Sequence, residues 1–250
     1  MNIVITGASS GIGEALALHY AAKGVSLGLT GRDGARLEGV ARACRRKGAL
    51  VEAAVLDVCD RAGMRAWLEK FDSVRPVDLA IVNAGIGGGA RGATPEALEA
   101  ARRIFEVNID GVNNTLEPLL PRMAARKAGQ VALMASLAGY RGVPGAPAYA
   151  ASKGFVKLYG EGLRGALWRK GIRVNVICPG FVVSRLTGFN DFPMPFLMSA
   201  ERAAAIIARG LARNRPRIAF PWPMAFAVWW LAALPAVLSE WVVRRLPKKK

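Results

Sequence analysis

Two side chains four residues apart, Tyr149 and Lys153, have the types and spacing needed to move a proton. The run that follows them, GFVKLYGEGLRGALWR, is typical of a helix, and residues four apart on a helix share one face. An ammonium about 4 Å from a phenol favours the phenolate by about 4 kcal/mol at an effective dielectric near 20, or roughly three pKa units. Such a tyrosine could give a proton to a carbonyl oxygen or take one from an alcohol. Ser136, which ends the strand-like run QVALMAS, could hydrogen-bond the same oxygen.

The elements that must position this pair begin with a glycine-rich turn near the start of the chain. The apolar run Asn2–Thr6 predicts a buried strand, and the helical pattern EALALHYAAKG follows the turn. In this order the glycines permit close backbone approach, and the helix N-terminus offers free N–H groups to a pyrophosphate. Tyrosine–lysine pairs also occur in helices without catalytic roles, so this phosphate-binding context is what favours chemistry. The residues expected to hold a dinucleotide here are Gly7, Ser9, Ser10, Gly11, Ile12 and Gly13.

Strand and helix patterns alternate through the rest of the chain. Strands are expected at 25–30, 50–58, 77–85, 130–136, 172–178 and 217–220, with helices near 33–47, 61–71 and 95–127 (the last one broken) and beyond Tyr149. Such alternation predicts an α/β, doubly wound Rossmann fold of about seven parallel strands with helices on both faces. We expect one catalytic domain over residues 1–220, with a substrate lid near 181–200, and a C-terminal helical extension over 221–250.

Composition and charge limit the functions that the chain could have. The 250 residues carry a formal charge of +17, but the basic residues are scattered, without an aromatic platform or zinc-like spacing. A nucleic-acid-binding function therefore rests on charge alone, and we expect neither a nucleic acid partner nor a metal. The positive surface favours anionic partners such as phosphorylated cofactors or acidic lipid headgroups. Three widely spaced cysteines, and a chain that begins directly with a strand, indicate a cytoplasmic location without a signal peptide.

From about residue 2 to residue 220 the sequence resembles the short-chain dehydrogenase/reductase family. The resemblance rests on TGASSGIG, an NAG motif, an asparagine in NIDG, the serine–tyrosine–lysine set and a Pro-Gly turn, all in the family's order. It implies an NAD(P)-dependent oxidoreductase that interconverts a ketone or aldehyde and its alcohol. The catalytic residues that it implies are Asn108, Ser136, Tyr149 and Lys153.

The resemblance also assigns roles. Tyr149 is the general acid or base, Lys153 lowers its pKa and bonds the nicotinamide ribose, and Ser136 polarises the substrate oxygen. Asn108 holds a water that links Lys153 to solvent, and the hydride comes from the cofactor. Ser184 stands where the family commonly has a threonine. Tyr149 and Lys153 are also implied to contact the cofactor, and the further cofactor contacts implied are Asp57, Val58, Asn83, Ala84, Gly85, Pro179, Gly180, Val182 and Ser184.

The end of the second strand indicates which dinucleotide is used. NAD enzymes usually place an acidic residue there for the adenosine ribose hydroxyls, whereas this chain has Gly31 followed by Arg32. A guanidinium suits a 2′-phosphate, so we expect NADP(H) to be preferred over NAD(H). Arg32 could instead be an ordinary surface arginine opening a helix, and Asp33 beside it weakens the signal.

Residues 181–198, FVVSRLTGFNDFPMPFLM, fall where the family builds its substrate lid, and they are mostly apolar. An apolar lid favours a hydrophobic, lipid- or steroid-like substrate. The same side chains could instead pack the lid onto the core, and both alternatives stay open. The residues concerned are Phe181, Phe189, Phe192, Phe196, Leu197 and Met198.

The last thirty residues exceed what the fold requires. No charged residue occurs from Ile218 to Ser239, four of the six tryptophans lie in this stretch or just after it, and the chain ends in Arg244, Arg245 and three lysines. Prolines leave Met224–Leu234 as the uninterrupted apolar piece, which is too short to span a membrane. We expect residues 222–250 to contact the cytoplasmic face of a membrane, with packing on the pocket or on another subunit as the alternative.

Two further expectations concern assembly and activity. The resemblance implies a homodimer or homotetramer formed through the helices after the fourth and fifth strands. A non-enzymatic NADP-binding sensor or scaffold on the same fold stays open as the alternative function.

Overall fold

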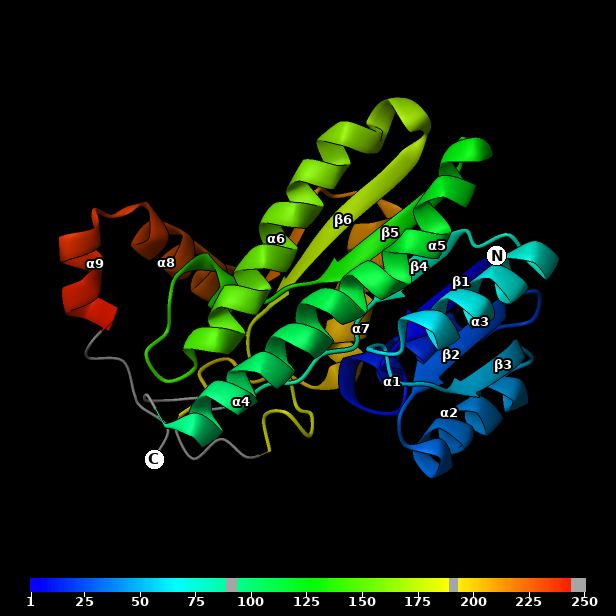
Figure 1. Cartoon of the computed structure of the whole chain (residues 1–250), viewed down its shortest axis with the longest axis horizontal. Coiled ribbons are helices and arrows are strands. Elements are labelled where there is room, and N and C mark those ends of the chain that lie inside the picture. Colours follow the sequence, from blue (N-terminus) through cyan, green and yellow to red (C-terminus); the bar gives the residue numbers. More distant parts are fainter. Residues whose placement is uncertain (89–93, 189–192, 244–250) are drawn as a thin grey trace.

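The computed structural model describes residues 1–88, 94–188 and 193–243. Seven strands form one parallel sheet in the order β3-β2-β1-β4-β5-β6-β7 (Figure 1). The chain order reverses between β1 and β4, and in doubly wound sheets ligands bind outside the carboxyl ends of the strands at that point. The predicted doubly wound sheet is therefore confirmed. The strands are β1 Asn2–Thr6, β2 Ser26–Gly31, β3 Leu50–Val55, β4 Leu79–Val82, β5 Gly129–Met134, β6 Ile172–Pro179 and β7 Arg217–Phe220.

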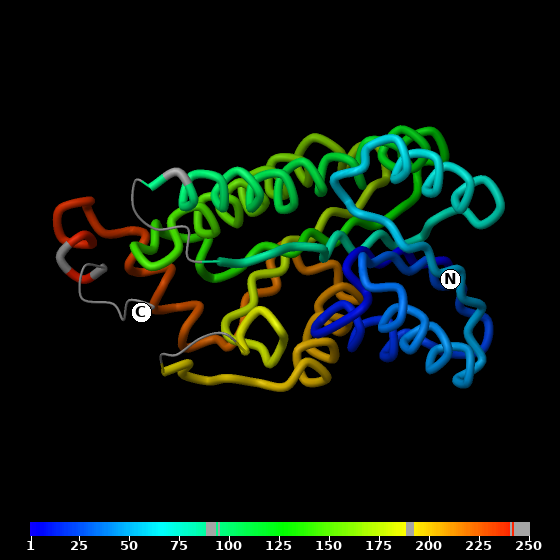
Figure 2. Tube along the Cα trace, turned by 60° about the horizontal axis from the view of Figure 1, so that its bottom comes forward, coloured from blue at the N-terminus to red at the C-terminus, as the bar shows by residue number. Residues whose placement is uncertain are grey.

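Helices cover both faces of the sheet, as right-handed crossovers between parallel strands require. One layer holds α1, α2 and α7, and the opposite layer holds α3 to α6 (Figure 2). After β7 the chain continues into α8 and α9, beside the carboxyl ends of the strands. The helices are α1 Gly11–Tyr20, α2 Gly34–Arg46, α3 Arg61–Val74, α4 Pro95–Phe105, α5 Gly111–Ala125, α6 Pro147–Leu167, α7 Ala200–Ala212, α8 Trp222–Ala233 and α9 Ala236–Val243.

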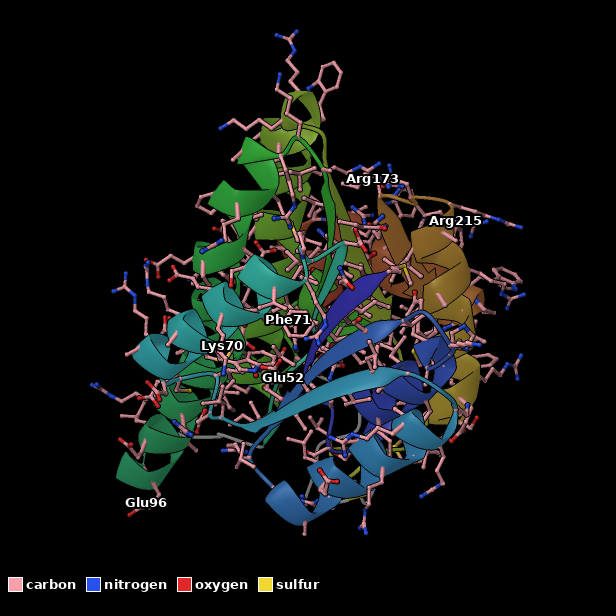
Figure 3. The ribbon with its side chains drawn as sticks, turned by 90° about the vertical axis from the view of Figure 1, so that its right-hand side faces the viewer. Glu52, Lys70, Phe71, Glu96, Arg173 and Arg215 are labelled. Carbon is pink, nitrogen blue, oxygen red and sulfur yellow. The ribbon has the colours of Figure 1, made fainter. Side chains whose placement is uncertain are left out.

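The sheet packs against both helical layers through fully buried aliphatic residues. One contact shows how close this packing is. The Phe71 ring points from α3 towards the sheet (Figure 3), and its nearest atom lies 3.0 Å from where a Cβ on Gly28 of β2 would stand. Glycine at this strand position therefore makes room for a large aromatic ring.

The long helical pattern over 95–127 is interrupted, as predicted. A π-helical turn, Glu106–Asp110, separates α4 from α5 and carries Asn108, which is buried. Single π-turns inside α-helices occur frequently at functional sites because the extra residue changes which side chains face inward.

Candidate active site

A cavity of about 1590 Å³ lies at the carboxyl ends of the strands. Its walls come from the β1–α1 turn, the ends of β2 to β6, the loop before α7 and one side of α8. Of the site residues expected from sequence, all line this cavity except Gly13 and Asn108, which lie directly behind it. The structure thus brings residues from across the whole chain into one site.

The glycine-rich turn has the shape that a pyrophosphate cradle needs. Gly7 and Gly11 have φ values of +67° and +57°, which side chains rarely adopt. A Cβ on Gly13 would stand 2.2 Å from the Gly7 carbonyl oxygen. The Asn83 amide donates to the carbonyl oxygens of Thr6 (3.0 Å) and Gly7 (3.2 Å), so the NAG motif fixes the turn. Free N–H groups at the start of α1 complete an anion site, and the residues fit a dinucleotide.

Ser136, Tyr149 and Lys153 meet at the centre of the cavity. Ser136 follows β5 and caps a short 3-10 helix, Leu137–Tyr140, by accepting from the Ala138 N–H at 3.1 Å. Tyr149 and Lys153 lie one turn apart on α6, and the Lys153 Nζ is 5.9 Å from the centre of the Tyr149 ring. Lys153 is 5% exposed and donates to the Met134 carbonyl oxygen at 2.8 Å, which fixes the ammonium at the end of β5.

The pKa of Tyr149 shifts in the direction opposite to the one expected from the sequence. Burial raises the pKa of Tyr149 above its ordinary value, although its hydrogen bond with Ser136 lowers it. The expected net lowering by Lys153 is therefore wrong for this structure, because desolvation of the phenol dominates. A phenol that stays protonated at neutral pH suits a general acid, which donates to a carbonyl oxygen. Burial likewise lowers the pKa of Lys153, to about 8.

The lowered pKa of Lys153 predicts how a Lys153→Met variant behaves with pH. Between about 8 and 10.5 the unfolded chain holds a proton that the folded chain lacks, so this lysine makes stability rise with pH. We expect the free energy of unfolding of the wild type, minus that of Lys153→Met, to increase by about 3 kcal/mol across this window. Urea unfolding at several pH values measures it. A difference that does not change with pH would contradict the lowered pKa.

Asn108 lies behind the lysine and is fully bonded. Its amide donates to the Ile86 carbonyl oxygen (2.9 Å) and the Ser152 hydroxyl (3.0 Å), and its Oδ1 accepts from the Ile86 N–H at 2.8 Å. A Cβ on Gly85 would stand 3.1 Å from both Asn108 Oδ1 and Lys153 Nζ, so these groups converge. The sequence reading missed Ser152, a buried hydroxyl that also donates to the Tyr149 carbonyl oxygen at 2.8 Å. Its position directly before Lys153 in the sequence is the feature that could have identified it as part of the site.

At the other end of the cavity Arg32 extends from the end of β2. Its Nη1 lies 3.8 Å from Asp57 Oδ2, which also accepts from Arg103 at 2.9 Å. Burial raises the pKa of Asp57, but hydrogen bonds from Cys59 and Arg103 outweigh it and hold the pKa below its usual value. Asp33, which weakened the sequence signal, caps α2 by accepting from the Arg36 N–H at 3.0 Å. Sequence reasoning missed both Arg36, which lines the cavity, and Arg103.

The lid region contributes less aromatic surface than its composition suggested. Phe181 lines the cavity, but Phe196 and Leu197 are 58% and 44% exposed, and Met198 is buried in the core. Phe189 and Phe192 lie outside the described residues. Among the described residues of this loop, the remaining apolar lining comes from Val182, Leu186, Pro193 and Pro195.

One of the two C-terminal helices, α8, forms a further part of the wall. Met224, Val228 and Leu231 of α8 line the cavity, so the pocket-packing alternative for this segment holds for one side of α8. Among residues 1–88, 94–188 and 193–243, no helix is long and apolar enough to cross a membrane. The same described residues contain no cluster of histidine, cysteine and acidic side chains suited to a metal ion.

A phosphate cradle next to a serine–tyrosine–lysine set, in a cleft at the carboxyl ends of parallel strands, defines an oxidoreductase site for a nicotinamide dinucleotide. The model of the short chain dehydrogenase family matches residues 1–191. An uncharacterized oxidoreductase of Myxococcus xanthus (strain DK1622) is 38% identical over 244 residues, which is 97% of this chain and 96% of that protein. The chain therefore belongs to the short-chain dehydrogenase/reductase family, whose members act on CH–OH and C=O groups.

Solved structures show the same fold. Levodione reductase is similar with a TM-score of 0.81 and 26% identity, covering 90% of this chain and 98% of its own. A short-chain dehydrogenase from Sphingobium yanoikuyae in complex with NADPH also has a TM-score of 0.81, at 24% identity, and covers 100% of this chain and 97% of its own. The similarity to the second structure includes the whole length of this chain, with the C-terminal helices.

Proposed function

We propose that this protein is an NADPH-dependent reductase that interconverts a ketone or aldehyde and its alcohol, and that its substrate is hydrophobic. The observation that carries the proposal is that Ser136, Tyr149 and Lys153 face the same cavity as the phosphate cradle and the apolar side of α8. A carbonyl compound held between these walls would meet a proton donor, a cofactor site and an apolar surface at once.

The residues of this chain would act as follows. The bound dinucleotide supplies a hydride to the carbonyl carbon. The hydroxyls of Ser136 and Tyr149 hold the carbonyl oxygen, and Tyr149 gives that oxygen its proton, so the carbonyl becomes an alcohol. The Lys153 ammonium stabilises the phenolate that remains until a proton returns from solvent on the Asn108 side. In the direction of oxidation, Tyr149 takes the proton from the alcohol instead.

The size and lining of the cavity support a hydrophobic substrate. Ligand pockets usually have volumes of about 300–1,000 Å³, and this cavity, at about 1590 Å³, has room for a dinucleotide and a second molecule. Beyond Tyr149, its wall is formed by Phe181, Leu186 and the inner side of α8. Apolar walls of this kind favour a lipid- or steroid-like body attached to the reacting carbonyl.

Three features of the adenosine end support NADPH over NADH. Arg32 and Arg36 both line the cavity there. A side chain at Gly31, where NAD enzymes carry an acid, would approach the Ser9 hydroxyl to 2.9 Å. The nearby carboxylate of Asp57 is paired with Arg103, which offsets its repulsion of a phosphate. Arg36 is paired with Asp33, which also lines the cavity, so Arg32, with its longer 3.8 Å contact to Asp57, is the cation better placed to meet a 2′-phosphate.

We therefore expect Arg32→Ala to weaken NADPH binding about tenfold or more and to leave NADH binding nearly unchanged, since a hydrogen bond to a charged group contributes about 1.5–3 kcal/mol. Arg42→Ala, which removes an exposed arginine farther along α2, is the matched control and should change neither affinity. Fluorescence titration with both dinucleotides measures this. Equal losses for NADPH and NADH would show that Arg32 does not read the 2′-phosphate.

Turnover tests the proposal as a whole. Purified protein should oxidise NADPH faster than NADH when a long-chain ketone is present, and the product should be the corresponding alcohol. Dinucleotide binding without turnover of any carbonyl compound would favour the sensor or scaffold function instead.

We propose in addition that the protein forms a homodimer or homotetramer and works in the cytoplasm, in contact with a membrane surface. Exposed apolar side chains on the helices after β4 and β5 support the assembly, since Leu98 of α4 is 58% exposed and Leu158 of α6 is 65% exposed. Light scattering of the purified protein would measure the oligomeric state.

A further inference from the structure

Helix α8 is apolar on all sides, yet within residues 222–233 the structure buries none of its side chains. Helices that are hydrophobic all round are normally enclosed by protein or lipid. Isolated exposed apolar residues need no explanation, whereas contiguous ones indicate a surface that something covers.

The side chains of α8 divide into two sets at helical spacing. Met224, Val228 and Leu231 line the cavity. At about 100° per residue, the mean direction of the four aromatic residues of α8 is about 180° from the mean direction of these three. These outer residues are Trp222, Phe226, Trp229 and Trp230, with exposed fractions of 77%, 60%, 52% and 55%.

Helix α9, which follows α8 directly, also exposes apolar side chains. Val237, Leu238 and Val242 are 80%, 56% and 37% exposed there. Both helices project from the end of the molecule at which the strands finish, away from the two helical layers (Figure 1). We call the four aromatic residues of α8 and these three residues of α9 the outer apolar face. It lies on the other side of α8 from the active-site cavity.

We propose that the outer apolar face lies on the surface of a bilayer containing anionic lipid, and that the substrate is a carbonyl compound dissolved in that bilayer, which reaches Tyr149 past α8. The substrate claim rests on the proposed reductase function, whereas the bilayer contact does not. A helix that is a pocket wall on one side and meets lipid on the other would let an apolar molecule pass without crossing water.

The charge of the C-terminal segment and the length of its helices favour a bilayer surface over a second copy of the chain or a membrane span. From Ala203 to Lys250 the only acidic residue is Glu240, and the chain ends in two arginines and three lysines. A segment whose sequence combines tryptophans with a basic end suits the headgroup region, where aromatic rings and basic side chains both gather. A second copy docked on the same face would instead bring together two C-terminal segments that each end in Arg244, Arg245 and three lysines. Within the described residues no helix is both long and apolar enough to cross a membrane, so α8 and α9 would lie on the bilayer.

The test uses the full-length protein and two double variants. Phe226→Ser/Trp229→Ser removes a neighbouring aromatic pair, with ring centroids 6.1 Å apart, from the outer apolar face. Val74→Ser/Trp168→Ser is the matched control, because these residues are 68% and 65% exposed and belong to α3 and to the turn after α6, away from the outer apolar face. Each protein is sedimented with phosphatidylcholine vesicles, with and without 30% phosphatidylglycerol. Each is then assayed on one long-chain ketone, supplied either in the vesicles or as a soluble cyclodextrin complex.

We expect the wild type and the control to bind the anionic vesicles, and the outer-face variant to bind about tenfold more weakly or worse. The outer-face variant should reduce the vesicle-borne ketone about tenfold more slowly and the cyclodextrin-borne ketone at the wild-type rate. Failure of the wild type to bind either kind of vesicle would overturn the bilayer contact. So would a change from dimer to monomer in the outer-face variant, without loss of lipid binding, because a second copy would then cover this face.

The two halves of the inference separate in the same experiment. If lipid binding falls in the outer-face variant but the vesicle-borne ketone is still reduced at the wild-type rate, delivery from the bilayer is wrong. If neither form of the ketone is reduced by the wild type, the reductase function fails, and the substrate claim fails with it, while the sedimentation result still decides the bilayer contact.

Discussion

Tyr149→Phe should lower kcat for ketone reduction by about 100- to 10,000-fold, the usual contribution of a positioned general acid. The variant keeps the ring, which lies 5.9 Å from the Lys153 Nζ, and removes the proton that the carbonyl oxygen receives. NADPH affinity should fall by about tenfold at most, because one neutral hydrogen bond contributes about 0.5–1.5 kcal/mol. Stopped-flow measurement of NADPH oxidation and a fluorescence titration separate the two effects.

Tyr159→Phe provides the matched control on the same helix. Tyr159 stacks on Phe155 at 5.3 Å between ring centroids and packs against the buried cluster on that face of the sheet. Removal of the Tyr159 hydroxyl should leave kcat unchanged. If Tyr149→Phe retained most of the wild-type kcat, the proton would have to come from another group, and the role assigned to Tyr149 would be wrong.

The second large effect is expected for Gly13→Ala. The new Cβ would stand 2.2 Å from the Gly7 carbonyl oxygen and 2.6 Å from the Asn83 amide nitrogen, and both atoms are held by the turn itself. Overpacking of this kind costs about 1–3 kcal/mol of folding stability. Because the displaced backbone is the phosphate cradle, we expect dinucleotide binding to weaken more than tenfold.

Gly39→Ala should raise the folding stability instead of lowering it, and this variant serves as the control for Gly13→Ala. Gly39 lies in the middle of α2, and a Cβ there would meet no described atom within 4 Å apart from its chain neighbours and the backbone of its own helix. Replacing a mid-helix glycine by alanine stabilises by about 0.5–1 kcal/mol. Urea unfolding and NADPH titration of both variants measure the contrast. A Gly13→Ala protein with wild-type stability and affinity would show that the turn can open without cost.

The parts of the site that sequence could predict depend on local pattern. The strand, glycine turn and helix at the start of the chain are contiguous, and the four-residue spacing of Tyr149 and Lys153 is set by the helix itself. Parallel strands place their carboxyl ends together, so Asn83, Ser136 and Pro179 could be assigned to one edge before any coordinates existed. These residues all line the cavity.

What sequence could not predict depends on contacts between distant segments. The pairing of Arg103 with Asp57 joins residues 46 positions apart, and the Asn108 bond to Ser152 joins residues 44 apart. The net direction of the Tyr149 pKa shift depends on how deeply the phenol is buried, which no spacing reveals. Likewise, the apolar composition of the lid does not show that Phe196 and Leu197 face outwards.

The most direct test of the central claim is kcat/KM for NADPH-dependent reduction along a series of methyl ketones of increasing chain length. If the apolar wall formed by Phe181 and α8 holds the substrate, kcat/KM should rise about two- to fourfold for each methylene buried, until the cavity is filled. The same series with NADH should give lower values throughout. A series in which the shortest, most water-soluble ketones are the best substrates would contradict the hydrophobic pocket. Absence of turnover along the whole series would contradict the reductase assignment for these carbonyl compounds.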